Sequence, residues 1–110
     1  MLDILKVCGK NIRRYRKEKD LTLEQLSHSL GITGSYLGYL ERGQRNTSLL
    51  TLAKIAEILG VTPDILLRVP KDEFQEALYE LYDLLTNTND VKHVTFLKEV
   101  MESYLKLNYK

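Results

Sequence analysis

Residues 21–43, LTLEQLSHSLGITGSYLGYLERG, contain two short helical patterns separated by one sharp turn. Thr22 has a glutamine three residues later, and this capping box predicts the start of the first helix. Gly31 ends that helix, because glycine adopts the left-handed conformation that a tight turn requires. Thr33 is the candidate N-cap of the second helix. Two helices this short cannot bury themselves, so other helices must complete a core.

Apolar periodicity on both sides of this stretch predicts those other helices. One covers residues 3–19, one begins at Thr47 or Ser48 and ends at Gly60, and a short one covers residues 63–67. No segment shows the alternation of a half-buried strand, so the predicted fold is all-α. The residues predicted to face inward in the first four helices are Ile4, Cys8, Ile12, Tyr15, Leu23, Leu26, Leu30, Leu37, Leu40, Leu49, Leu52, Ile55, Ala56 and Leu59.

The chain changes character at residues 69–72, Val-Pro-Lys-Asp, which we interpret as a linker. Apolar residues at helical spacing predict a helix over 72–85 and a last helix over 91–107, with a turn at 86–90. We therefore predict a five-helix domain over residues 1–69 and a two-helix hairpin over residues 70–110.

Composition limits the class of protein. The chain has 110 residues, 44% of them hydrophobic and 28% charged, as expected for a soluble globular protein. A single cysteine excludes a disulfide framework within the chain and fits the cytoplasm. No apolar run approaches the roughly 20 residues of a membrane span, so we expect no membrane partner.

The net charge of +1 hides an uneven distribution. Residues 1–69 carry 11 Lys and Arg against 7 Asp and Glu, whereas residues 70–110 carry 5 against 8. Six of the ten residues over 10–19 are basic. Such a run is either a solvated helix face or a patch that meets phosphates, and the charges alone do not decide between them.

Four motifs together resemble a known family. They are Arg13 to Arg16, Leu26-x-x-x-x-Gly31-Ile32-Thr33, Tyr36-Leu37-x-x-Leu40-Glu41-Arg42-Gly43, and Leu52-x-x-Ile55-Ala56-x-x-Leu59-Gly60-Val61. The run from residue 12 to 67 is similar to the phage repressor and Cro-like (XRE-type) helix-turn-helix regulators of bacteria. The layout with a two-helix tail is similar to that of SinR-type regulators. The resemblance implies a lambda-repressor-like fold that binds double-stranded DNA.

The resemblance makes the helix after Thr33 the recognition helix in the major groove. It implies base contacts on the outer face of that helix, at Gly34, Ser35, Tyr36, Gly38 and Tyr39. The two glycines depart from the common pattern, because they offer no side chain to a base. Leu23 also departs, since the family often has a phosphate-binding glutamine there. We therefore expect recognition that depends partly on DNA shape and dimer spacing, or close approach of the backbone to DNA.

Phosphate contacts are expected from helix N-termini and from cations beside the recognition helix, because amides and cations neutralise the DNA backbone. The resemblance further implies a structural ion pair between Arg16 and Glu41. The residues expected to contact phosphates are Arg13, Arg14, Lys17, Thr22, Thr33, Arg42, Gln44, Arg45 and Asn46.

The tail is expected to form a homodimer, because an amphipathic hairpin leaves apolar surface that a second copy covers. It could instead fold back on its own domain or bind a heterologous protein such as an antagonist. The residues predicted for the dimer interface are Phe74, Leu78, Leu81, Tyr82, Leu85, Val94, Leu97, Met101, Tyr104 and Leu105.

Catalytic and metal-binding patterns are weak. His28 and His93 are isolated, and one cysteine supplies no metal-ligand cluster, so we expect no metal, no cofactor and no enzyme. We predict a cytoplasmic, homodimeric repressor that binds a palindromic operator. The alternatives are an antitoxin, or a protein-interaction module of the same fold whose tail binds another protein. The operator, the regulated genes and the inducing signal are not encoded in these patterns.

Overall fold

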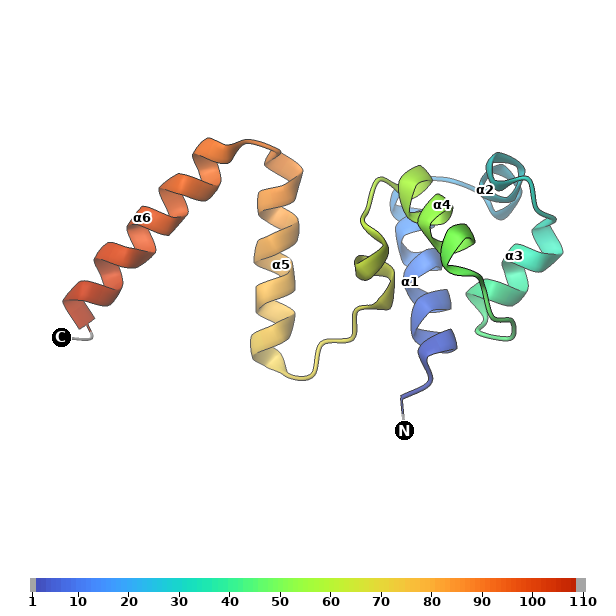
Figure 1. The fold of residues 1–110 in the computed structure, drawn as a ribbon, viewed down its shortest axis with the longest axis horizontal. Helices are drawn as coiled ribbons and strands as arrows, with labels where there is room; N and C mark the ends of the chain where they lie inside the picture. The colour runs from blue at the N-terminus through green and yellow to red at the C-terminus, as the bar shows by residue number, and fades with distance from the viewer. Residues whose placement is uncertain (1, 109–110) are drawn as a thin grey trace. The chain divides into compact units, whose positions relative to one another are not determined.

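The structure is a computed structural model that describes residues 2–108, and every regular element within that range is helical (Figure 1). Contacts divide the chain into two units, residues 1–69 and residues 70–110. The elements in chain order are α1 (Ile4–Glu18), α2 (Leu23–Leu30), α3 (Gly34–Glu41), α4 (Leu49–Leu59), the 3-10 helix η1 (Pro63–Leu67), α5 (Glu73–Thr88) and α6 (Val91–Asn108).

Side-chain caps fix the boundaries of α2 and α3 where the sequence predicts them. The backbone amide of Gln25 donates to the Thr22 hydroxyl at 3.0 Å, and the Gln25 side chain accepts from the Thr22 amide at 2.8 Å. Gly31 ends α2 in the left-handed conformation, with φ of 71°. The Thr33 hydroxyl accepts from the amide of Tyr36 at 3.0 Å. The capping box and both helix starts are thus confirmed.

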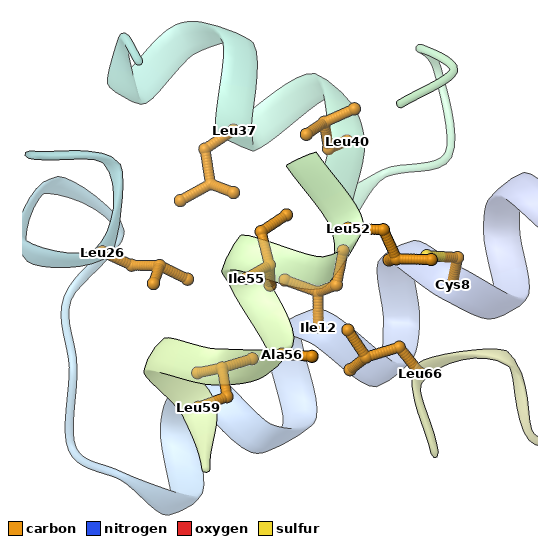
Figure 2. Packing of buried hydrophobic residues seen from close by; sticks show 10 residues of the cluster. All are labelled: Cys8, Ile12, Leu26, Leu37, Leu40, Leu52, Ile55, Ala56, Leu59 and Leu66. Atoms are coloured by element: carbon orange, nitrogen blue, oxygen red, sulfur yellow. The ribbon is translucent and has the colours of Figure 1, made fainter. Parts of the chain in front are cut away.

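The core of the first unit lies between α1, α2, α3, α4 and η1, and Figure 2 shows its side chains converging from all five elements. Ile55 of α4 is fully buried at its centre. Cys8 is buried in the same cluster, next to Leu52 in Figure 2, and burial raises the pKa of its thiol, as suits a packing residue. The buried cluster consists of Cys8, Ile12, Leu26, Leu37, Leu40, Leu52, Ile55, Ala56, Leu59 and Leu66.

Two residues predicted to face inward are exposed instead. Ile4, the first residue of α1, has a side chain that is 45% exposed. Leu49 was assigned to the inward stripe of α4, yet its side chain is 83% exposed. It is the first residue of α4, and periodicity does not reveal where the neighbouring elements stop covering a stripe. The short helix predicted over residues 63–67 is confirmed, and it is a 3-10 helix, the common form of so short a segment.

The α1 and α3 backbones touch at Gly9. A Cβ atom there would lie 2.3 Å from the carbonyl oxygen of Leu40 and 2.5 Å from that of Glu41, so only glycine fits. Asn11 of α1 makes a second tie, since its side-chain amide donates to the carbonyls of Leu66 and Arg68 at 2.9 and 3.1 Å. Helix α1 therefore holds both α3 and the end of η1 in place.

The second unit consists of α5 and α6, which meet at Asn89 and diverge from there (Figure 1). The predicted turn at 86–90 was too long, because α5 continues to Thr88. The hydroxyls of Thr86 and Thr88 donate to the carbonyls three residues earlier, at 3.0 and 2.7 Å, which satisfies them within the helix. No described side chain of α5 or α6 is buried.

The ion pair expected between Arg16 and Glu41 is present and joins α1 to the end of α3. Arg16 Nε and Nη2 donate to the two carboxylate oxygens at 2.6 and 3.0 Å, and Nη1 donates to the carbonyl of Leu21 at 2.9 Å. Both side chains are largely buried, at 11% and 6% exposure. The hydrogen bond to Glu41 raises the pKa of the guanidinium above its ordinary value. The pair thus joins the two helices and sets the angle of α3 on α1.

Replacing Arg16 by alanine should lower the free energy of unfolding by about 3–5 kcal/mol, because it leaves the Glu41 carboxylate buried without its partner. Arg14→Ala is the matched control: Arg14 pairs with Glu18, but that pair is exposed, so its loss should cost less than about 1 kcal/mol. Urea unfolding of the full chain followed by circular dichroism measures both. Equal midpoints for Arg16→Ala and the wild type would contradict this role.

Candidate nucleic-acid interface

The outer face of α3 is the surface that α1 leaves uncovered. Ser35 and Tyr39 are exposed on it, and Gly34 is half-buried. Tyr36 is half-buried, since its ring packs against the core and its hydroxyl donates to the Asn46 carbonyl at 3.4 Å. Tyr36 thus braces the loop that follows α3.

Gly38 is buried rather than open, although it belongs to the outer face. A Cβ atom at this position would lie 3.1 Å from Nη1 of Arg42, so the guanidinium lies directly over the glycine. By contrast, a Cβ at Gly34 would meet only the Ser27 hydroxyl, at 3.8 Å. The two glycines that look equivalent in sequence therefore have different surroundings.

Two arginines flank the ring of Tyr39. The guanidinium carbons of Arg42 and Arg45 lie 5.1 and 5.3 Å from the ring centroid, within range for cation–π interaction. Arg42 Nε also donates to Gln44 Oε1 at 3.1 Å. The sequence assigned Tyr39 to bases and the others to phosphates, whereas the structure brings all four into one cluster.

A shallow groove runs between the start of α2 and the outer face of α3. Glu24 is the one lining residue with a negative charge, and sequence reasoning missed it. Its position in the first turn of α2 is evident from the capping box, but its place opposite α3 follows only from the packing of the two helices. The groove is lined by Leu23, Glu24, Gly34, Ser35, Gly38, Tyr39 and Arg42.

The other predicted phosphate contacts surround this groove or lie on α1. The hydroxyls of Thr22 and Thr33 serve as helix caps, so the first-turn amides of α2 and α3 are the groups positioned for an anion. Arg13 and Lys17 are exposed on α1. Arg14 is also exposed, but its Nε donates to Glu18 at 3.3 Å, which partly neutralises it.

Within residues 2–108, no group of three or more His, Cys, Asp or Glu side chains is placed to hold a metal ion. Nor does any helix described there have the length and apolar character to cross a bilayer.

This geometry defines a helix-turn-helix domain with an exposed second helix. A model of the helix-turn-helix (HTH_3) family matches residues 12–66. The chain belongs to this XRE-type family of bacterial transcriptional regulators, and its first unit has the family's DNA-binding fold. The tail lies outside the matched residues.

Similar proteins support the same assignment. The HTH-type transcriptional regulator y4dJ of Sinorhizobium fredii is 42% identical over 72 residues, covering 66% of this chain and 92% of that protein. The restriction-modification controller C.AhdI from Aeromonas hydrophila is 40% identical with a TM-score of 0.54, covering 56% of this chain and 94% of that one. The biofilm regulator SinR, solved in complex with DNA, is 37% identical with a TM-score of 0.53, and the match covers 56% of this chain and 98% of that one.

Proposed function

We propose that the protein is a sequence-specific repressor that binds an operator as a homodimer, with α3 of each copy in the major groove. The observation that carries this proposal is the outer face of α3, which presents Ser35 and Tyr39 beside two arginines while α1 holds its opposite side. The similarity to SinR, whose structure was solved in complex with DNA, supports DNA as the ligand.

Phosphate contacts would position this face over the groove. The amides at the starts of α2 and α3 are donors aimed outward from helix N-termini, which attract anions. Cations around them release counterions when they neutralise phosphates, so binding should weaken steeply with salt. The cationic and amide side chains proposed for this role are Arg13, Arg14, Lys17, Gln44, Arg45 and Asn46.

In this proposal, repression results from occupation of the operator by the protein. A protein bound across a promoter excludes polymerase without any catalytic group. We propose a cytoplasmic location, because that is where a bacterial chromosome lies.

Selection of bound duplexes from fragmented genomic DNA tests this function directly. The full chain at near-physiological salt should enrich one inverted repeat whose half-sites are about 34 Å apart, or a multiple of that distance, because one α3 spans only a few base pairs. Ser35→Glu on the exposed face of α3 should abolish enrichment by repelling DNA. Thr95→Glu adds the same charge to α6, outside the helix-turn-helix unit, and should leave the enrichment intact. Folded wild-type protein that enriches no sequence would refute the proposal.

The tail supplies the proposed dimer contact. Its apolar side chains are exposed along both helices, and unpartnered apolar surface of this kind is unusual for a monomer. A second copy covers it and also supplies the second recognition helix. Beyond the residues predicted from sequence, the exposed apolar side chains of α5 and α6 include Leu84, Val91, Phe96, Val100 and Leu107.

Met101→Glu should disrupt this dimer. The side chain is 50% exposed in the single chain, and a carboxylate buried at an interface costs several kcal/mol, so the dimer dissociation constant should rise at least about 100-fold. Thr95→Glu, on the polar face of α6, is the control. Sedimentation equilibrium of the full chain gives the mass of each variant.

A wild-type chain that sediments as a monomer would contradict self-association. A monomer that nevertheless depends on Met101 to capture a second protein would favour the antitoxin or interaction-module function instead.

A further inference from the structure

Three residues, Gly34, Gly38 and Arg42, follow one another at intervals of four along the outer face of α3. Side chains on a helix lean toward its N-terminus, so a residue covers the surface of the turn before it. Arg42 does this over Gly38, where the space for a Cβ atom lies 3.1 Å from Nη1 and 3.6 Å from Nη2. The missing side chain at Gly38 thus makes room for the guanidinium on the recognition face.

The guanidinium is held there by its neighbours. The Tyr39 ring centroid lies 5.1 Å from its carbon, and Gln44 Oε1 accepts from Nε at 3.1 Å. Both Nη groups lie beside Gly38, and Arg42 is part of the groove lining. A planar fork that is oriented before binding loses less entropy when it makes two parallel hydrogen bonds.

The other side of the groove has the opposite hydrogen-bonding character. Glu24 of α2 lines the groove, as does Arg42 after α3. Whereas a guanidinium only donates hydrogen bonds, an ionised carboxylate only accepts them. Glu24 lies in the first turn of α2, where a carboxylate is favourable for the helix. Facing DNA, it is repelled by phosphates unless a donor on a base meets it. The cytosine amino group is the donor that Asp and Glu accept from in the major groove.

We propose that this groove recognises the major-groove edge of a G·C base pair, with Arg42 donating to O6 and N7 of guanine and Glu24 accepting from N4 of cytosine. The inference rests on the proposed DNA-binding function. Guanine O6 and N7 match the spacing of an arginine fork, and Gly34 beside them lets the base edge approach α3 closely. Arg42 thereby becomes a base contact, in place of the phosphate contact predicted from sequence.

The test uses the duplex that the wild-type chain selects, together with every single base-pair substitution in one half-site. Fluorescence anisotropy gives the dissociation constant for each duplex at several salt concentrations. Wild-type protein should lose about 5- to 150-fold in affinity when one particular G·C pair is replaced. In Arg42→Ala this preference should vanish while the preferences at other positions remain.

Three further variants separate base reading from charge. Gly38→Ala keeps every charge but displaces the guanidinium, so it should weaken the G·C preference and leave the salt dependence unchanged. Glu24→Ala should weaken the same preference and raise the affinity for all duplexes, because it removes a negative charge. Arg45→Ala removes the second cation beside the Tyr39 ring. It should lower the affinity for all duplexes alike and reduce the salt dependence of binding. Circular dichroism confirms that each variant is folded.

The inference is overturned if Arg42→Ala lowers the affinity for all duplexes equally and reduces the salt dependence of binding, because Arg42 is then a phosphate contact. It is equally overturned if Gly38→Ala retains the full G·C preference. In either case a selected operator still supports the proposed function. If the wild-type chain selects no sequence, both the proposed function and this inference are refuted.

Discussion

The contact between α1 and α3 is the constraint on which the first unit depends. At Gly9 no side chain separates the two backbones. Seven residues further along α1, Arg16 forms the buried pair with Glu41 that locks the end of α3 to α1. One face of α3 is thereby committed to packing. Its other face, with Ser35 and Tyr39, is exposed by the same arrangement, so the structural pair determines which residues are available to DNA.

Features that depend on local chemistry could be predicted from the sequence. The caps at Thr22 and Thr33 and the inward position of Ile55 follow from hydrogen bonding and periodicity over a few residues. The arrangement of Arg42 over Gly38 could not be predicted, because it depends on the direction of one flexible side chain. Glu24 was missed because its place in the groove depends on how α2 packs against α3.

Prediction from sequence reaches a similar limit for the tail, α5 and α6. Its helices and the apolar stripe containing Leu97 follow from spacing, but Phe96 and Val100 make the apolar surface of α6 wider than one stripe. Periodicity identifies which residues share a face and says nothing about what covers that face. If a second copy covers it, dimerisation brings two recognition faces together, and specificity then depends on the tail as well as on α3.

An NMR titration of the isotope-labelled full chain with its selected duplex tests the central claim, that the outer face of α3 is the DNA-reading surface. We predict that the largest amide shifts occur from Thr33 to Gln44 and around Thr22, and that Ile55 and its neighbours in the core of α4 change little. Shifts concentrated on α4 and η1, with the amides of α3 unmoved, would contradict the account.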